Sequence, residues 1–382
     1  MILLPFYVDD IIKTALTEDI NYIDSTADLL IPEDSISSAY FMSKADGVLC
    51  GLEVALRVFT ILDPEMKIEC RFKDGDKVKY GDIIAEFTGH TRLMLKAERT
   101  SLNLLQHMSG ISSYTNKCVE LVKGTNASIA DTRKTLPGLR PLQKYAVTVG
   151  GGRNHRYNLT DAAMLKDNHI DAYGGITAAV NALRQKAGHM LQIEVETRNL
   201  EEVQEAVDCG VNVIMLDNMD CPAMKQAAEL CRAAGRANGG HRPLLEASGG
   251  ITDETLRAVA ETGVDIISIG ALTHSVKAMD ISMKIRSSLE VKQKNGEFVG
   301  AFAPYGYKKS PENKNQLIVD EAVSEYVQMI FSMYKDGFSI GRIADRLNQM
   351  GVLSPMEYKH SAGVKFDTVF KTSDTAKWTY KA

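Results

Sequence analysis

The chain has 382 residues and carries 44 Lys and Arg against 49 Asp and Glu, a formal net charge of −5. At about 150 residues per domain, this length predicts two or three domains. A hydrophobic share of 45% with 24% charged residues excludes wholesale disorder and collagen-like structure. No run of about 20 apolar residues occurs, so we expect no transmembrane helix. The N-terminus lacks the basic segment of a signal peptide.

Cysteine usage points to a reducing compartment. The six cysteines form no C-x-x-C pair and no Cys/His spacing typical of a zinc site. Disulfides would need an oxidising compartment, of which the sequence gives no sign. We therefore expect free thiols in a cytoplasmic protein with no membrane partner.

The composition changes near residue 284. Residues 284–382 carry 15 Lys and Arg against 11 Asp and Glu, a balance of +4, so the preceding 283 residues carry 29 against 38, or −9. The same tail holds 13 of the 26 aromatic residues and the only tryptophan, Trp378. Such a break indicates two parts of different origin.

The first 124 residues predict a mixed α/β unit. An amphipathic helix is expected over residues 8–20 and a strand before a turn over 37–51. Residues 67–89 contain an Asp-Gly pair between two apolar runs, which predicts two strands joined by that turn. A long helix capped by Thr91 is expected to reach residue 124, with an interruption near Gly110.

Residues 125–273 alternate between short apolar runs and helical patterns that end in glycine. Strands that alternate with helices predict a parallel sheet covered by helices. The spacing is compatible with either a (β/α) barrel or a doubly wound sheet. A polar residue follows or ends five of the expected strands, and a barrel would gather these positions at one mouth: Lys166, Glu196, Asp217, Ser248 and Ser268.

A basic cluster lies between residues 131 and 169, inside a part of the chain that is otherwise acidic. This contrast favours a small polyanionic ligand over nucleic acid, which would need a broad basic face. The alternative is a solvated loop, against which the triple glycine at 150–152 argues, because it lets a ligand approach the backbone. Arg140, Lys144 and Arg153 are each as compatible with a structural role. The cluster comprises Arg133, Lys134, Arg140, Lys144, Arg153, Arg156 and Lys166, with His155 and His169.

Acidic and Ser-Gly positions at other strand ends complete the candidate site. Glu194 and Glu196 lie two apart on one expected strand and so face the same side, and Asp217 ends the next strand. These acids suit ribose hydroxyls or Mg²⁺, and are also compatible with structural salt bridges. Residues 248–250 and 268–270 follow the last two strands, where barrels often bind phosphate.

Seven motifs in order resemble the quinolinate phosphoribosyltransferase family over about residues 1–283: TRKTLPGLR, KYAVTVGGGRNHR, LKDNH, EVE, LDN, EASGGI and SIGALTHS. The resemblance implies a type II phosphoribosyltransferase fold, with an N-terminal α/β sandwich (1–112) and an open, incomplete α/β barrel (113–283). It also implies that quinolinate and 5-phosphoribosyl 1-diphosphate react with Mg²⁺, and no organic cofactor, to give nicotinate mononucleotide, CO₂ and diphosphate in NAD biosynthesis.

Residue roles follow from the same resemblance. Lys134, Lys166, Glu196 and Asp217 match catalytic positions, and Glu196 and Asp217 also lie near a metal bound through the substrate. Arg99 matches an arginine that enters the neighbouring subunit's site in a homodimer. The remaining substrate-binding positions match the carboxylate, donor and 5-phosphate contacts: Arg133, Thr135, His155, Arg156, Ser248, Gly249, Gly250, Ser268, Ile269 and Gly270.

The tail, residues 284–382, resembles the recombinase domain of large serine recombinases, on the cues GEFVGAFAPYGYKK and IADRLNQMGV. We expect a mostly helical, helix-turn-helix-like appendage, with a helix from about 321 to 335 capped by Asp320, a turn at Gly337, and a second helix capped by Ser339 that reaches about residue 350. A fragment without activity of its own is favoured over residual DNA binding, because +4 over 99 residues is weak for DNA.

Three functions are therefore weighed. The leading one is the carboxylating nicotinate-nucleotide pyrophosphorylase reaction. The second is a DNA-binding recombinase fragment fused to an inactive barrel. The third is a related barrel phosphoribosyltransferase that uses another aromatic acid.

Overall fold

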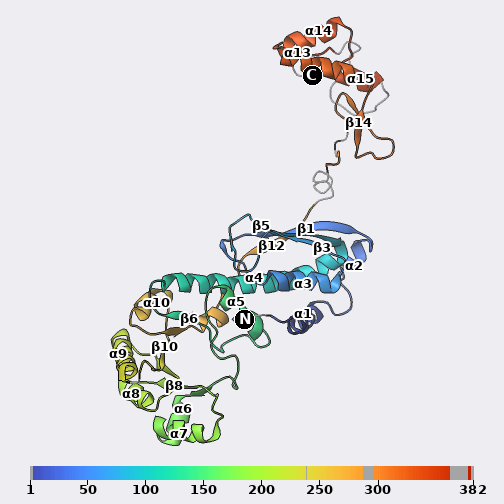
Figure 1. The fold of residues 1–382 in the computed structure, drawn as a ribbon. Helices are drawn as coiled ribbons and strands as arrows, with labels where there is room; N and C mark the ends of the chain where they lie inside the picture. Colours follow the sequence, from blue (N-terminus) through green and yellow to red (C-terminus); the bar gives the residue numbers. More distant parts are fainter. Residues whose placement is uncertain are drawn as a thin grey trace. The chain divides into compact units, whose positions relative to one another are not determined.

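The computed structural model describes residues 3–237, 239–286, 296–298, 300, 302–361 and 377–379. The chain divides into two compact units, Met1–Ile285 and Arg286–Ala382 (Figure 1). Among the described residues, no helix combines the length and apolar character that a bilayer crossing requires.

An antiparallel sheet forms the first layer of unit 1. Its strand order is β12-β1-β5-β3, with β1 at Ile36–Ser43, β5 at Ile83–His90, β3 at Lys67–Cys70 and β12 at Ile281–Ile285. Strand β12 thus returns from beyond the barrel to pair with β1. A short pair, β2 (Gly47–Val48) with β4 (Lys77–Val78), accompanies this sheet. The helices of this part are α1 (Pro5–Asp19), α2 (Ala27–Leu30) and α3 (Leu52–Leu62).

The hairpin expected over residues 67–89 is only partly present. Strands β3 and β5 do pair antiparallel, but residues 71–82 connect them and β4 in that connection pairs with β2 instead. The Asp74 carboxylate accepts hydrogen bonds from the backbone amides of Gly51 (2.8 Å) and Leu52 (2.9 Å) at the start of α3. Because helix N-termini leave amides unpaired, Asp74 serves the helix rather than a tight turn.

Helix α4 (Thr91–Leu121) runs without a break, contrary to the interruption expected at Gly110. A Cβ at position 110 would lie 2.3 Å from the backbone oxygen of Lys277, so the glycine permits a close approach of two backbones. Thr91 is the first helical residue rather than the cap, and its hydroxyl pairs with those of Ser35 (3.0 Å) and Ser37 (2.8 Å). Figure 1 shows α4 between the two sheets.

The second layer is a six-stranded parallel sheet with the order β6-β11-β10-β9-β8-β7. All six strands expected between residues 125 and 273 are present. Strands β6 and β7 occupy the two edges and do not pair among the described residues, which gives the open, incomplete barrel. The strands are β6 (Ser128–Ala130), β7 (Ala163–Leu165), β8 (Ile193–Thr197), β9 (Val213–Asp217), β10 (Leu244–Ser248) and β11 (Ile266–Ser268).

Helices connect these strands, as the alternating pattern predicts for parallel pairing. The helices expected after β8, β9 and β10 are confirmed as α8, α9 and α10. The set is α5 (Arg140–Val149), α6 (Asp167–Tyr173), α7 (Ile176–Lys186), α8 (Leu200–Asp208), α9 (Cys221–Ala237), α10 (Asp253–Ala260) and α11 (Ala271–His274).

Unit 2 has its own small core around Trp378. The indole nitrogen of Trp378 donates to the backbone oxygen of Val352 (3.0 Å). Its buried neighbours are Ile343, Ala344, Leu347 and Val352. The elements are the hairpin β13 (Tyr307–Lys309) and β14 (Leu317–Val319), followed by α13 (Ser324–Lys335), α14 (Ile340–Gln349) and α15 (Pro355–Ser361).

Two expected caps in unit 2 have different outcomes. Ser339 caps α14, since its hydroxyl accepts from the Arg342 amide at 3.4 Å, and Gly337 turns the chain with φ +86°. Asp320 does not cap α13, which begins at Ser324. Its carboxylate instead accepts from the Tyr358 hydroxyl at 2.8 Å, which ties the start of α13 to α15.

The close approach at Gly110 predicts a large cost for a single methyl group. We expect Gly110→Ala to lower the free energy of unfolding by about 1–3 kcal/mol or more, because the backbone of Lys277 must move. Chemical denaturation measures this. Gly188→Ala is the control, since nothing lies within 4 Å of its Cβ position. Equal stability of both variants would contradict the packing described here.

Strand β12 predicts where the first unit can be ended. A chain that stops after Arg286 should melt like the intact unit 1. A chain that stops after Asp280 loses buried Ile281 and Met283 and should lose about 3–6 kcal/mol, at roughly 1.5–3 per side chain. Thermal and urea unfolding of the two truncated chains compare them. Equal stability would show that β12 does not contribute to the sheet's stability.

Candidate active site

A cavity of about 510 Å³ opens at the carboxyl ends of the parallel strands. Its lining draws together most of the positions singled out in the sequence, from five different strand ends and the basic segment. Those lining it are Arg133, Lys134, His155, Arg156, Lys166, Glu196, Asp217, Ser248 and Ser268.

A fully buried ion pair supports the basic segment. The ammonium group of Lys144 lies 2.5 Å from the Asp131 carboxylate, and neither side chain is exposed. Asp131 also accepts from the backbone amide of His155 (2.8 Å), and Lys144 donates to the backbone oxygen of His155 (3.0 Å). Burial raises the pKa of Asp131 and lowers the pKa of Lys144, against their mutual attraction. Lys144 is thus structural, one of the two roles its position allowed.

Arg140 also serves the framework. Its Nε donates to the Thr135 hydroxyl (2.9 Å), and its guanidinium donates to the backbone oxygen of Tyr157 (3.1 Å). Thr135 therefore orients Arg140 and does not line the cavity. Arg153 pairs with Ala130 in an isolated parallel bridge at the edge of the sheet.

Arginine charge is left unbalanced at the cavity. The Nε of Arg133 is buried and finds no hydrogen-bond partner within the described part of the chain. Burial, followed by the charges of Arg156 and Arg140, lowers the pKa of Arg133. Cationic groups that destabilise one another in this way favour an anionic ligand with paired acceptors.

Two strand-end acids face the same cavity. Glu196 accepts from the ammonium group of Lys166 at 2.5 Å, so these two charges offset each other in the free site. Asp217 is exposed at the end of β9. Asn218 follows with a left-handed backbone (φ 53°), and its backbone amide donates to the Ser248 backbone oxygen at 2.9 Å. Carboxylate oxygens of Glu196 and Asp217 are the hard ligands that Mg²⁺ prefers.

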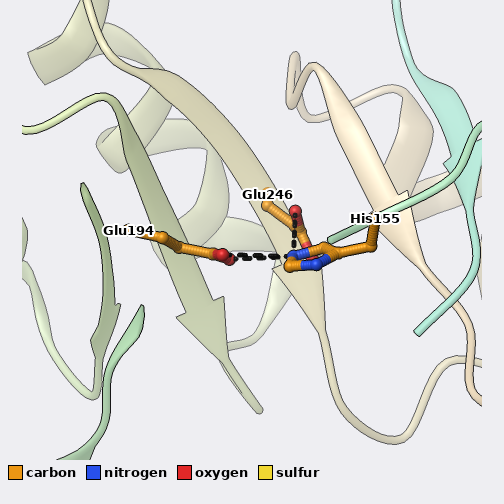
Figure 2. Close-up of side chains that lie close together, drawn as sticks. All are labelled: His155, Glu194 and Glu246. Carbon is orange, nitrogen blue, oxygen red and sulfur yellow. Dashed lines mark hydrogen bonds and ion pairs between the residues drawn. The ribbon is translucent and has the colours of Figure 1, made fainter. Parts of the chain in front are cut away.

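A second layer lies beneath these acids, formed by His155, Glu194 and Glu246 (Figure 2). The Nε2 of His155 is 3.1 Å from Glu194 and 3.6 Å from Glu246. Burial opposes protonation of His155, but the hydrogen bond and charge of Glu194 and the charge of Glu246 outweigh it and raise the pKa of His155. Their ligand atoms lie within 4.8 Å of one another, a spacing that a cation could bridge, but the imidazole already contacts both carboxylates.

The remaining predicted positions lie beside the cavity or away from it. Gly249 has φ +90° and a Cβ there would lie 2.2 Å from Asn218 Oδ1, so this turn requires glycine. A Cβ at Gly270 would lie 3.0 Å from the Lys134 side chain. Ile269 is buried. Gly250 completes the turn after β10, and Arg99 is exposed on α4, outside the cavity of its own protomer.

Sequence reasoning missed the deeper lining of the cavity. The missed residues are Thr132, Met164, Asp167, Met215 and Glu246. Three of them lie two positions before a predicted strand-end residue, so the alternation of side chains along a strand places both on one face. That period was applied to Glu194 and Glu196 and would have found Glu246 from Ser248.

Family comparisons agree with this geometry. Residues 24–109 match the model of the quinolinate phosphoribosyl transferase N-terminal domain, and residues 111–284 match that of its C-terminal domain. Residues 321–381 match the family model named Recombinase.

Individual relatives match over the first unit. A probable carboxylating nicotinate-nucleotide pyrophosphorylase from Bacillus subtilis is 43% identical over 273 residues, which is 72% of this chain and 91% of the relative. The chloroplastic carboxylating nicotinate-nucleotide pyrophosphorylase of Arabidopsis thaliana is 44% identical over 299 residues, covering 73% of this chain and 83% of that protein.

Solved structures show the same likeness. The structure of NadC from Streptococcus pyogenes matches with a TM-score of 0.71 at 41% identity, over 75% of this chain and 99% of that one. The nicotinate-nucleotide pyrophosphorylase of Francisella tularensis matches with a TM-score of 0.69 at 37% identity, over 75% and 98%. With its sequence motifs gathered at one cavity of this fold, the chain belongs to the quinolinate phosphoribosyltransferase family.

Proposed function

We propose that unit 1 is a carboxylating nicotinate-nucleotide pyrophosphorylase. It transfers the phosphoribosyl group of 5-phosphoribosyl 1-diphosphate to quinolinate and releases nicotinate mononucleotide, CO₂ and diphosphate. One observation carries the proposal: Arg133, Lys134 and Arg156 line the cavity without an ion-pair partner among the described residues, beside the strand-end carboxylates of Glu196 and Asp217. The names of the relatives describe the same reaction.

Substrate charge explains the cations. Quinolinate has two carboxylates, and the donor has a diphosphate and a 5-phosphate. The paired donors of Arg133 and Arg156 suit carboxylates, and the free Nε of Arg133 supplies a further donor. Ser248 and Ser268, at the ends of neighbouring strands, offer hydroxyls for the 5-phosphate, with Gly249 and Gly250 exposing backbone amides beside them.

The strand-end acids suit the sugar carbon. Loss of diphosphate from C1 builds positive charge on the ribose ring, as in glycoside cleavage. Glu196 and Asp217 stabilise that charge and are placed to bind ribose hydroxyls. A magnesium ion bound with the diphosphate would be held by the same two carboxylates and would neutralise the leaving group. Lys134 and Lys166 add positive charge next to the phosphates.

The two other functions have less support. The tail, residues 284–382, contains the match to the Recombinase model, but its balance of +4 over 99 residues gives little electrostatic attraction for DNA. The cations suit an aromatic acid with two carboxylates. The third function would be supported if pyridine monocarboxylates competed strongly with quinolinate, and opposed if they did not.

Turnover should depend on Lys134 and Glu196 far more than stability does. We expect Lys134→Ala and Glu196→Ala to lower kcat/KM by at least about 100-fold, because each removes a charge that stabilises the transition state. Both side chains are at least partly exposed, so melting temperatures should change little. The readout is nicotinate mononucleotide formed from quinolinate, donor and Mg²⁺.

Exposed Lys186→Ala in α7 and Glu229→Ala in α9 are the matched controls and should keep wild-type turnover. Near-normal product formation by Lys134→Ala and Glu196→Ala would remove these residues from the mechanism. Absence of product from the wild-type chain would refute the proposed reaction itself.

A homodimer that shares its sites predicts complementation. We propose that Arg99, which is exposed on α4, completes the cavity of a second copy. Arg99→Ala and Lys134→Ala should each be inactive alone. A mixture refolded at equal amounts should regain about a quarter of wild-type activity, since half of the dimers are mixed and each has one intact site. No recovery from mixed dimers would place Arg99 outside the partner's site.

A further inference from the structure

Glu246 is a buried acid at the cavity that the reaction described above does not use. It lies on β10, is 1% exposed, and contributes to the cavity lining. Its Oε1 finds no hydrogen-bond partner among the residues that the structure describes. Its Oε2 lies 3.6 Å from the Nε2 of His155 (Figure 2). A buried ionised carboxylate with one oxygen unpartnered is costly, so the neutral form is favoured.

The hydrogen bonds of His155 decide which of the three side chains, His155, Glu194 or Glu246, carries a proton. The backbone amide of Arg156 donates to Nδ1 at 2.8 Å, which leaves the single ring proton on Nε2. The charges of Glu194 and Glu246 favour a second ring proton on Nδ1. That proton would point at the backbone N–H of Arg156 across the 2.8 Å contact. The Nε2 proton lies nearer Glu194, at 3.1 Å, than Glu246, at 3.6 Å, so the imidazole hydrogen bond goes to Glu194 and Glu246 retains its own proton.

Burial and the neighbouring acidic charges also favour the neutral form of Glu246. Burial comes first, followed by the charge of Glu194 on β8, and together they raise the pKa of Glu246 to about 7. Asp131, after β6, adds to the rise, whereas His155 and the Ser268 hydroxyl on β11 oppose it. The buried ammonium group of Lys144 on α5 is already paired with Asp131.

The proposed reaction has an unmet need for a proton. Once ribosylated, the pyridine nitrogen is cationic. The bond from the adjacent ring carbon to its carboxylate then breaks, CO₂ leaves, and the electron pair stays on that carbon. A new C–H bond must form there before nicotinate mononucleotide is complete.

We propose that Glu246 is a catalytic acid that enters the reaction as a neutral carboxyl group and gives its proton to the ring carbon that has lost CO₂. The inference rests on the proposed function of the same cavity. Glu246 becomes a carboxylate in this step and regains a proton from solvent once product leaves. His155 and Glu194 are positioning residues, which keep the neighbouring proton on Nε2 and away from the reacting carbon.

Substitution by glutamine separates acid catalysis from packing. Glu246→Gln keeps the size and a hydrogen-bond donor but has no proton to give. In a single turnover we expect diphosphate release within about threefold of wild type. Formation of nicotinate mononucleotide should be at least about 100-fold slower, the scale of general acid catalysis. Glu246→Asp keeps an acid and should be intermediate.

The pH dependence gives a second readout. Wild-type turnover should fall as pH rises through about 7, because Glu246 must be protonated. This alkaline decrease should be absent in Glu246→Gln and retained in Glu246→Asp. Without any substrate, the wild-type melting temperature should fall relative to that of Glu246→Gln between pH 5 and 8, since a carboxyl with a raised pKa loses folding stability as it ionises.

Glu86→Gln is the matched control, because Glu86 is also buried in a strand and ion-paired, but with Arg71 in the antiparallel sheet. It should change neither turnover nor its pH profile. Equal slowing of diphosphate release and product formation in Glu246→Gln, or wild-type rates for both, would overturn the proposal. A wild-type chain that makes no product would instead refute the proposed function, and the substrate-free melting comparison would still test the proton on Glu246.

Discussion

The buried ion pair of Lys144 with Asp131 is the interaction on which the cavity depends. Removing one member of a buried pair leaves an uncompensated charge, at a typical cost of about 3–5 kcal/mol. Here the pair also binds the backbone of His155 from both partners. The segment with Arg133 and Lys134 and the segment with His155 and Arg156 are thereby held on one side of the sheet. The buried pair thus joins two segments whose cationic side chains, such as Arg133 and Arg156, repel one another.

Strand periodicity turns that support into a layered site. Strands β7, β9 and β10 each present two residues to the cavity, one at or just after the strand end and one two positions earlier. The outer layer contains Lys166, Glu196 and Asp217, whose charged side chains line the cavity. The inner layer contains Glu194 and Glu246, both buried and both in contact with His155. The outer acids are at least partly exposed, whereas burial raises the pKa of the inner acid Glu246. The alternation of side chains along the strands thus supplies both partly exposed acids and buried acids at one site.

The chain's division into two units follows from where its cores close. Unit 1 is complete only when β12 pairs with β1, after the chain has passed through the whole parallel sheet. Unit 2 has a separate cluster in which Trp378 packs on α14 residues such as Leu347. The family models divide the chain in a similar way, with a phosphoribosyltransferase match ending at 284 and a Recombinase match from 321.

Local patterns in the sequence determined most of the strands and helices of the parallel sheet, because turn glycines and apolar runs are short-range signals. The motifs also determined the family, since their order along the chain requires no coordinates. The sequence placed Lys166, Glu196 and Asp217 at strand ends, and a parallel sheet gathers such ends at one edge.

Only the tertiary structure decided which charged residues face the ligand and which support the fold. Lys144 and Arg140 are of the same residue types as the cavity-lining lysine and arginine. Their partners differ, because Asp131 and Thr135 come from a loop that folds against them. Gly110 continues a helix where glycine usually weakens one, because a distant backbone at Lys277 touches it. Pairing of β12 with β1 and the neutral state favoured for Glu246 depend equally on residues far apart in the chain. Burial and long-range contact have no local signature, so these features emerge only when the chain is folded.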